Sequence, residues 1–333
     1  MQSLASHAPR VTCIAALLLL GTVQAWAVDG SSDCSLRIAS GPDDKVYAHM
    51  VNDMKSVCGA AVSVCSVASK GGLQNLSLLS ANSADLGIVQ IDTLQEMSTG
   101  DENVQTLQAV MPLHVNLLHV IALSSGSLVD VKTVAGAVVP FTGRKVVIRK
   151  FSELKGMTVA AVGSAQLMGQ TLEKRLGYGM NFVVADDDEA LRLLRTGKTQ
   201  AVFTLGGSPL DTVTRHPRDS GLQLVDFDLA LQTPYVSVKK NYENLGAYNL
   251  NFLGVPNLLV TRPFKSGGAM ANRVITLGAC LRQHLDELQE GRFKPGWKEI
   301  KDPDQVYGVR RFATVPSLGI APGNSGEMSS SAR

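Results

Sequence analysis

Apolar positions in this chain alternate between two spacings, and the alternation predicts helices and strands in succession. The first predicted helix carries apolar residues spaced by 4, 4 and 3 positions, at Val46, Met50, Met54 and Val57. Gly59 ends that pattern, and the Val-rich segment 62–68 that follows predicts a strand. Another apolar helix leads to a strand at 86–90. A strand–helix–strand succession of this kind indicates a parallel sheet.

The same succession returns after residue 150. Strands are predicted at 158–162, 182–185, 201–205 and 222–227, with amphipathic helices between the first three. The acidic run 186–189 opens one of these helices, where the helix dipole favours acids, so we interpret it as capping and not as a metal site.

Three further segments complete the predicted framework. Residues 107–123 hold two apolar runs around Pro112, and residues 251–261 form a long apolar strand that crosses back. The last helix is predicted to end at Gly291 and carries apolar residues at Val274, Leu277, Leu281, Leu285 and Leu288. Between the two halves, residues 129–139 and 145–148 predict a hairpin around 140–143, which we interpret as a peripheral decoration in preference to a lid.

The two ends of the chain are predicted to lie outside the fold. Residues 1–27 have a weakly basic start, an apolar core and an A-x-A site ending at Ala27, which predicts an export signal cleaved there. The alternative, an uncleaved anchor, is disfavoured because spanning needs about 20 apolar residues. Residues 315–333 are rich in Ser, Gly and Pro without periodicity, which predicts a disordered tail.

Composition narrows the class of protein. Roughly 300 residues follow the signal, enough for two α/β domains. The formal charge is +2, with no basic block, and aromatic residues make up 5%. This balance argues against a nucleic-acid partner.

The cysteines predict disulfides. Of the five, Cys13 lies in the predicted signal, which leaves Cys34, Cys58, Cys65 and Cys280. Four cysteines in an exported chain favour two disulfides, with three possible pairings. Metal binding is the alternative, but the spacing of Cys58 and Cys65 is not a usual zinc spacing.

Small polar junctions with glycine stand where several predicted strands lead into helices. They fall at 36–41, 64–72, 86–92, 159–164 and 201–208. Open α/β sheets bind ligands where strand carboxyl ends meet helix N-termini, and the free N–H groups there favour anions. The sequence therefore predicts two clusters of ligand-holding loops.

Five segments, in this order and spacing, carry a resemblance to a known family. They are I-A-S-G at 38–41 with Tyr47, G-G-L-Q-N-L at 71–76, A-D-L-G-I-V-Q-I-D at 84–92, L-K-G-M-T-V-A at 154–160 and A-V-F-T-L-G-G-S-P at 201–209. Across residues 36–312 the chain resembles the extracytoplasmic solute-binding proteins of the TAXI type. These are the receptor components of certain tripartite TRAP transporters.

The resemblance implies an α/β, two-lobed periplasmic-binding-protein type II fold, in which each lobe is a mostly parallel sheet flanked by helices and the solute is trapped in the cleft between the lobes. We expect lobe I to comprise 28–125 and 251–314, the inserted hairpin or hinge region 126–150, and lobe II 151–250. The ligand of such receptors is commonly a small carboxylate, such as an amino acid or a dicarboxylate.

The matching motifs imply ligand-binding candidates in both lobes. Those of the first lobe are Ser40, Gly41, Tyr47, Ser69, Lys70, Gly71, Gly72, Gln90 and Asp92. Those of the second lobe are Gly163, Ser164, Gln166, Thr204, Gly206, Gly207 and Ser208. Simpler roles compete: a core position for Tyr47, a solvated surface for Lys70 and a helix N-cap for Asp92. Asp43 and Asp44 depart from the family pattern and would repel an anion if they faced the cleft.

The resulting hypothesis is a periplasmic, monomeric receptor for a small-molecule solute, which it delivers to membrane transporter subunits encoded elsewhere. The alternative is a ligand sensor for a signalling membrane protein. An enzyme is disfavoured, because the G-N-S-G run at 323–326 lies in the predicted tail without a framework for a base. His114 and His119 stand five positions apart on a predicted strand, hence on opposite faces, and do not make a metal pair. We expect no cofactor, no metal and no catalytic residue.

Overall fold

A computed structural model describes residues 34–43, 45–130, 133–134, 137–138, 142–230 and 233–312. All of them belong to one compact unit. The predicted signal and its cleavage site, Cys13, Asp44 and the predicted tail lie outside the described residues.

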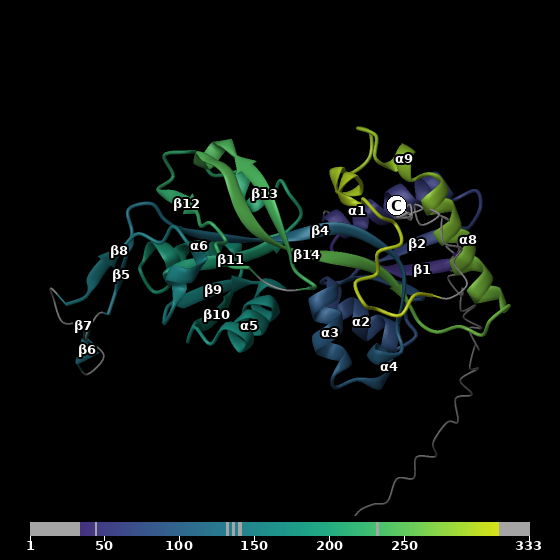
Figure 1. The fold of residues 1–333 in the computed structure, drawn as a ribbon, viewed down its shortest axis with the longest axis horizontal. Helices are drawn as coiled ribbons and strands as arrows, with labels where there is room; N and C mark the ends of the chain where they lie inside the picture. Colours follow the sequence, from purple (N-terminus) through teal and green to yellow (C-terminus); the bar gives the residue numbers. More distant parts are fainter. Residues whose placement is uncertain are drawn as a thin grey trace, which may run out of the picture. The chain divides into compact units, whose positions relative to one another are not determined.

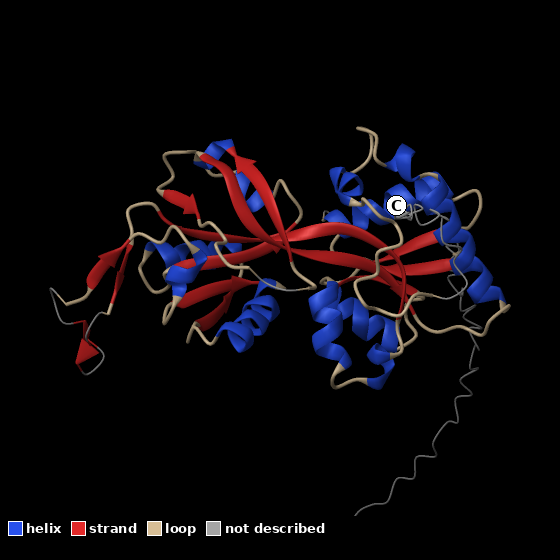
Figure 2. Cartoon of the chain, viewed as in Figure 1, coloured by secondary structure: helices blue, strands red, loops and turns tan. Residues whose placement is uncertain are grey.

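The fold is built on a ten-stranded mixed sheet with the order β10-β9-β11-β4-β14-β3-β1-β2, to which β12 and β13 add by pairing with β4 and β14 (Figures 1 and 2). Its strands are β1 (Leu36–Ala39), β2 (Val64–Val67), β3 (Leu86–Gln90), β4 (Gln108–Leu123), β9 (Thr158–Val162), β10 (Asn181–Ala185), β11 (Ala201–Gly206), β12 (Leu222–Leu224), β13 (Val236–Tyr242) and β14 (Ala247–Thr261).

The helices are α1 (Val46–Cys58), α2 (Gly72–Ser80), α3 (Ile91–Ser98), α4 (Glu102–Gln105), α5 (Ala165–Leu176), α6 (Asp187–Arg195), α7 (Asp211–Thr214), α8 (Ala269–Gln283) and α9 (Leu285–Leu288), with short 3-10 turns η1 (Phe151–Leu154), η2 (Glu243–Leu245) and η3 (Pro295–Glu299). Helices α1, α2, α5, α6 and α8 fall in segments that the sequence predicts as helical, whereas the short helices α4 and α7 were not predicted. We call β1–β3 with α1–α4 and α8 the first lobe, and β9–β11 with α5–α7 the second lobe.

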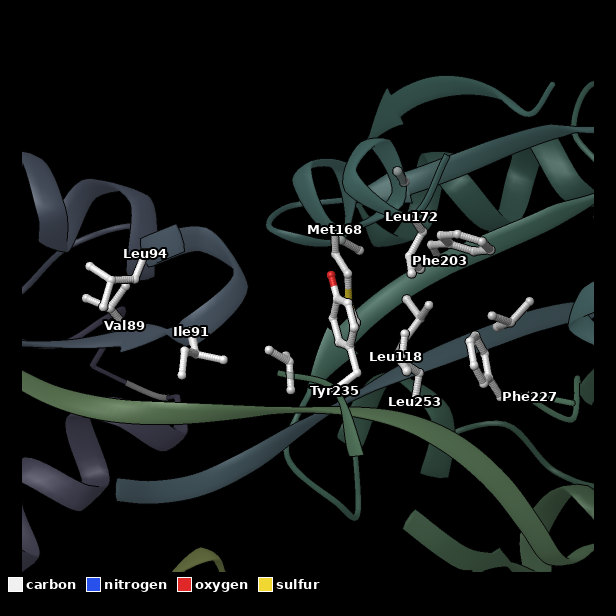
Figure 3. Packing of buried hydrophobic residues seen from close by; sticks show 14 of the residues in the cluster. Val89, Ile91, Leu94, Leu118, Met168, Leu172, Phe203, Phe227, Tyr235 and Leu253 are labelled. Atoms are coloured by element: carbon white, nitrogen blue, oxygen red, sulfur yellow. The ribbon is translucent and has the colours of Figure 1, made fainter. Parts of the chain in front are cut away.

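Apolar burial holds the helices on both faces of the sheet. In the first lobe, α1 and α8 share a buried cluster with Trp297 of η3. On the opposite face, α2 and α3 contribute to a cluster that continues into the second lobe (Figure 3). There Tyr235 extends toward Met168 of α5, between the labelled residues of the two lobes. The α/β, two-lobed architecture that the resemblance implied is confirmed.

The register of the strands sets the two lobes end to end. β1, β2 and β3 are parallel, β3 is antiparallel to β14, β14 to β4, and β4 to β11. The two parallel sets therefore run in opposite directions, with their carboxyl ends toward each other. Gln90, the last residue of β3, pairs with Asn257 of β14, whose side chain bonds the carbonyl of His114. Gly206, the last residue of β11, pairs with Leu117 of β4. The stretch 114–116 of β4 thus separates the two sets by about 10 Å, at ~3.4 Å per residue.

The segment around Pro112 and the last helix differ from the sequence prediction. The two apolar runs around Pro112 form one continuous strand, β4. The pairing of β4 with β14 shifts register at Pro112, and the loss of one interstrand hydrogen bond to the proline is tolerated there. The last helix does not run to Gly291. It breaks at His284, whose ψ of 17° departs from helical geometry, and a short α9 follows. Leu285 and Leu288 therefore lie on a separate turn.

The predicted hairpin is present in interrupted form. β5 (Ser127–Val129) pairs with β8 (Arg144–Val146), and β6 (Thr133–Val134) pairs with β7 (Ala137–Val138). The strand predicted over 129–139 is therefore replaced by the last residue of β5 and by β6 and β7, and the positive φ of Asp130 turns the backbone directly after β5.

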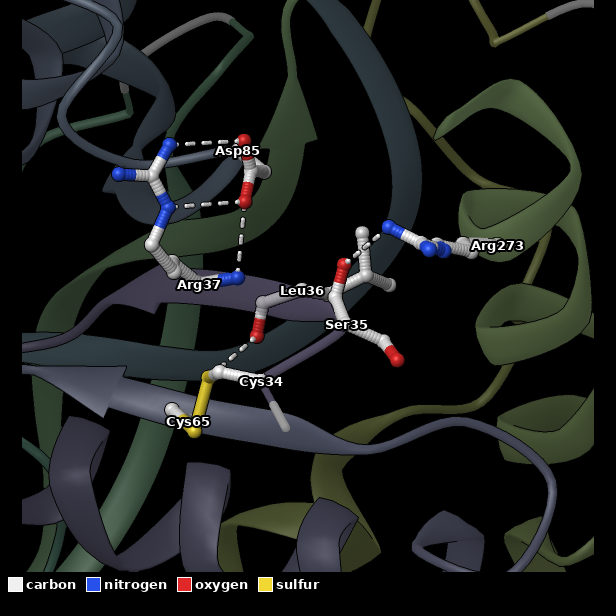
Figure 4. The surroundings of a disulfide bond; sticks show 7 residues. All are labelled: Cys34, Ser35, Leu36, Arg37, Cys65, Asp85 and Arg273. Carbon is white, nitrogen blue, oxygen red and sulfur yellow. Dashed lines mark hydrogen bonds and ion pairs between the residues drawn. A yellow bond between two sulfur atoms is a disulfide. The ribbon is translucent and has the colours of Figure 1, made fainter. Parts of the chain in front are cut away.

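Both predicted disulfides are present, in the pairing that the sequence left open. Cys34 joins Cys65 and Cys58 joins Cys280, with Cα–Cα distances of 5.8 and 5.9 Å, typical of disulfides. The first ties the residues before β1 to β2 (Figure 4), and the second ties the end of α1 to α8.

An ion pair reinforces the same corner of the first lobe. Arg37 of β1 donates to both carboxylate oxygens of Asp85 (Figure 4). Arg262 lies 3.2 Å from the same carboxylate. Burial works to raise the pKa of Asp85, but the hydrogen bonds and positive charge of Arg37, with that of Arg262, outweigh it and hold the pKa below its usual value.

Candidate functional site

The strand ends of the first lobe are fastened by Asn75 of α2. This side chain is fully buried, and its Nδ2 donates to the carbonyls of Ser40 (2.5 Å) and Ile88 (2.8 Å). Its Oδ1 accepts from the Ser69 hydroxyl at 2.5 Å. One amide thus fixes the ends of β1, β2 and β3 together. The sequence analysis missed this role, although a polar residue on the helix face that carries Leu76 and Leu79 is a signal for it.

The two serine–glycine loops predicted in this lobe lie around that amide. The hydroxyls of Ser40 and Ser66 are 2.7 Å apart, and Gly41 accepts from the Ser69 backbone at 3.4 Å. Gly71 has φ 111°, a value that favours glycine, and caps α2. Gly72 opens α2 beside the Gln90 backbone, where an added Cβ would stand 3.7 Å from the nitrogen. Lys70 is exposed.

Gln90 is the least satisfied polar side chain at this edge. It is 2% exposed, and its Nε2 has no hydrogen-bond partner within the described part of the chain. A buried amide without a partner is unfavourable by about 1–3 kcal/mol, so such a group calls for an explanation.

Asp92 does not cap a helix, so the N-cap prediction is wrong. α3 begins directly after β3 with Gln90 at the N-cap, and Asp92 is already inside its first turn. The Asp92 carboxylate accepts from the Thr93 backbone at 2.7 Å and lies 3.4 Å from the Tyr235 hydroxyl. Burial raises the pKa of Asp92 above its usual value, although hydrogen bonds from Thr93 and Tyr235 and the charge of Arg175 oppose the shift.

A buried polar cluster occupies the stretch of crossing strand between the two lobes. The Tyr47 hydroxyl of α1 donates to Asn257 Oδ1 at 2.5 Å and accepts from Asn116 Nδ2 at 3.1 Å. The imidazole Nε2 of His114 lies 3.0 Å from Asn116 Oδ1, and Asn257 Nδ2 donates to the His114 carbonyl at 2.9 Å. We call these four residues, which come from β4, β14 and α1, the hinge cluster.

The hinge cluster is uncharged. Burial lowers the pKa of His114 to about 4, so the imidazole is neutral at physiological pH. Burial also raises the pKa of Tyr47. His114 Nδ1 has no partner among the residues described. His119, on the opposite face as predicted, packs against Tyr242 and Phe252 instead.

The second lobe meets the hinge cluster through the loop after β11. A Cβ at Gly207 would stand 3.6 Å from Val46 of α1 and 3.8 Å from His114. The Leu210 backbone N–H in the same loop donates to the Tyr242 hydroxyl at 3.1 Å, while Thr204 is buried within β11 opposite His119. Gly206 is the last residue of β11, and a Cβ there would meet Leu210 at 2.6 Å.

The remaining second-lobe candidates stand at the start of α5. Gly163 has φ 56° with open space around its Cα, and Gly163 and Ser164 are exposed. Ser164 is the N-cap, and the Gln166 backbone donates to the Gly163 carbonyl at 3.2 Å. The structure therefore brings Tyr47, Gln90 and Gly207 to the hinge, whereas Gly163, Ser164 and Lys70 lie exposed at strand ends.

Most of the described α-helices have no side-chain cap, α1, α7, α8 and α9 included. The N-caps of α2, α3 and α5 are Gly71, Gln90 and Ser164, and no capping hydrogen bond from a side chain is present there. In contrast, α4 and α6 are capped by Asp101 and Asp186, as we predicted for the acidic run. The N-termini of α2, α3 and α5, at the carboxyl ends of β2, β3 and β9, thus keep backbone N–H groups open to an anion, apart from the Thr93 N–H of α3, which donates to Asp92.

A groove of about 660 Å³ lies between α3–α4 and α5, on the sheet face that also carries Tyr235. An ion pair between Lys174 and Glu96 joins α5 to α3 there, and the Arg175 guanidinium lies 5.1 Å from the Tyr235 ring. No predicted site residue lines this groove. Its lining residues are Glu96, Met97, Thr99, Gly100, Asp101, Glu102, Leu167, Gln170, Thr171 and Lys174.

The described residues contain no group of three or more His, Cys, Asp or Glu placed to hold a metal ion. Nor, within the same ranges, is any helix long and apolar enough to cross a membrane.

No protein-family model matches the chain, and no curated protein matches it. Among solved structures, an ancestral arginine-binding protein bound to arginine is similar with a TM-score of 0.44 and 12% identity, over 80% of this chain and 95% of that chain. An amino acid ABC transporter substrate-binding protein, AbpA from Streptococcus pneumoniae, bound to L-arginine, gives 0.46 and 13%, over 79% and 94%. A putative methionine-binding lipoprotein from Bacillus subtilis gives 0.42 and 11%, over 77% and 94%. At these values the likeness carries no inference about what this chain binds.

Proposed function

We propose that this chain is an exported solute-binding receptor that captures a small carboxylate or amino acid between its lobes and delivers it to a TRAP-type membrane transporter. One observation carries the proposal. The carboxyl ends of two opposed sets of parallel strands face each other across the hinge cluster, where the buried Gln90 amide has no partner among the described residues. Ligands of open α/β sheets bind at such carboxyl ends.

The donors around the hinge support a solute that carries a carboxylate. The Gln90 amide and the uncapped N-termini of α2 and α3 belong to the first lobe, and that of α5 belongs to the second. All of these groups donate hydrogen bonds, and helix N-termini favour negative charge. The hinge cluster itself is neutral, so recognition there rests on hydrogen bonds and not on a charged residue.

The proposal keeps the lobe boundaries at 28–125 with 251–314 and at 151–250, and cleavage after Ala27. It also treats the protein as a monomer. The two disulfides support export, because such bonds persist in oxidising compartments. Closure of the lobes on the solute would give a membrane partner a bound state to recognise.

A thermal-shift screen of carboxylates, amino acids and cationic amines on the purified chain tests the capture step. A solute present at 100 times its Kd stabilises the native state by about 2.7 kcal/mol. We expect only compounds with a carboxylate to raise the melting midpoint. Stabilisation by amines that lack a carboxylate, with none by any carboxylate, would overturn the ligand class and point to acidic residues such as Asp43 and Asp92.

Delivery is tested separately with candidate transporter subunits in proteoliposomes. We expect uptake of the captured solute to require this chain. Uptake that is equally fast without the chain would contradict the transport role while leaving solute capture intact.

A further inference from the structure

The hydroxyl of Tyr242, on β13, joins the loop after β11 to the crossing strand β4. It lies 2.6 Å from His119 Nε2 on β4 and accepts from the Leu210 backbone N–H at 3.1 Å. Two partners from two separate segments therefore converge on one oxygen.

Packing fixes the position of that oxygen. Tyr242 is 2% exposed, and its ring lies edge-on to His119 with centroids 5.3 Å apart and 5.8 Å from the Phe252 ring. Burial lowers the pKa of His119 to about 3, so this partner stays neutral across the working pH range. A tyrosine held this way offers a rigid polar point within an apolar cluster.

The loop that Tyr242 holds is one place where the second lobe approaches α1. Gly207 approaches Val46 and His114, as described above, and a Cβ at Gly206 would stand 2.6 Å from Leu210 Cδ1. The loop is therefore folded back tightly, and the bond from the Leu210 N–H to Tyr242 fixes the end that leads into α7.

We propose that Tyr242 is a positioning residue for solute binding, whose hydroxyl holds the loop 207–210 against the hinge cluster through the Leu210 N–H. The inference rests on the proposed function, because it assumes that the loop contacts the solute. It assigns Tyr242 no contact with the solute itself. It goes beyond the sequence motifs, since Tyr242 lies outside every one of them.

Tyr242→Phe tests the proposal, because it removes the hydroxyl and keeps the ring packed against Phe252. We expect solute affinity, measured by calorimetry, to fall about tenfold, the effect of losing one well-placed hydrogen bond. Tyr248→Phe is the matched control, because Tyr248 is 58% exposed, and we expect it to bind like the wild type. Unchanged affinity in Tyr242→Phe would overturn the proposal.

A double-mutant cycle with His119→Leu separates positioning from general destabilisation, because His119 is the side-chain partner of the Tyr242 hydroxyl. If the two groups hold the loop together, the two substitutions are coupled, and the double variant binds more tightly than the sum of the two single losses predicts. Additive losses, or a loss in Tyr242→Phe that tracks only a lower melting midpoint, would contradict a positioning role. Failure of the wild type to bind any solute would instead refute the proposed function.

Discussion

Replacing Gln90 by leucine should raise the stability of the solute-free protein and weaken its binding of the solute. Leucine is close to glutamine in size, and the Gln90 side chain is 2% exposed, with an Nε2 that no described residue satisfies. Burying an amide without a hydrogen-bond partner costs free energy, because the amide loses its hydrogen bonds to water. Replacing that amide by an apolar group removes this cost. We therefore expect the free energy of unfolding of the solute-free protein to rise by about 1–2 kcal/mol. The same change removes a proposed donor to the solute, and we expect affinity to fall about tenfold, or ~1.4 kcal/mol.

Urea unfolding of the solute-free protein and calorimetric titration of the solute measure the two effects separately. Gln95→Leu is the control, because Gln95 lies on the same helix that Gln90 caps but is exposed. We expect little change from it in either assay. If Gln90→Leu lowered the free energy of unfolding and left affinity unchanged, the side chain would be structural and the reasoning refuted. Opposite signs in stability and affinity are the signature of a residue kept for function.

Three further predictions concern the lobes and their fastenings. Lys174→Glu should reduce solute affinity several-fold, because it replaces an ion pair between α5 and α3 with repulsion; since Lys174 is 67% exposed, the free energy of unfolding should change by less than ~1 kcal/mol. Solute affinity should return in the charge-swapped double variant that combines Lys174→Glu with Glu96→Lys. A double variant that still binds weakly would contradict a role for this ion pair between the lobes. The pKa of Asp85 is lower in the folded protein than its unfolded value of about 3.9, so its ionised carboxylate stabilises the fold above that value. This stabilisation is lost as the pH falls through the lower folded pKa. The melting midpoints of the wild type and Asp85→Asn should therefore converge in acid and separate at neutral pH. Equal midpoints at all pH values would contradict this. Removing the Cys58–Cys280 disulfide, which closes a loop with a separation of 222 residues, should lower the free energy of unfolding by about 5 kcal/mol. Removing Cys34–Cys65, with a separation of 31, should lower it by about 4 kcal/mol. Chemical denaturation of the two variants, each with both cysteines replaced by alanine, measures which loss is larger.

Much of the framework could be predicted because buried parallel strands give short apolar runs and their helices give one apolar face. The predicted strands at 86–90 and 158–162 match β3 and β9. β13 was missed because its apolar alternation is brief: Val236 and Val238 are followed by Lys239 and Lys240. The break at His284 was missed because the apolar spacing continues across it.

The site was harder to predict than the fold for a physical reason. The roles of three buried amides, Asn75, Asn116 and Asn257, depend on hydrogen bonds to residues far away in the sequence, such as the bond from Tyr47 to Asn257. A single polar residue in an apolar run indicates that a partner exists, but not which one. The glycine-bearing loops were predictable, because strand ends in such sheets need tight turns. Their grouping into hinge-facing and exposed members depends on the register of β4 and β14.

The most direct test of the account is calorimetric titration of the purified chain with the carboxylate or amino acid that the thermal screen selects, for the wild type and Gln90→Glu. The account predicts one binding site per chain in the wild type, and at least a tenfold loss in Gln90→Glu, because a second carboxylate at the hinge repels that of the solute. Equal affinity in the two proteins would contradict the placement of the solute between the lobes. Absence of binding by the wild type to any compound of the screen would contradict the receptor itself.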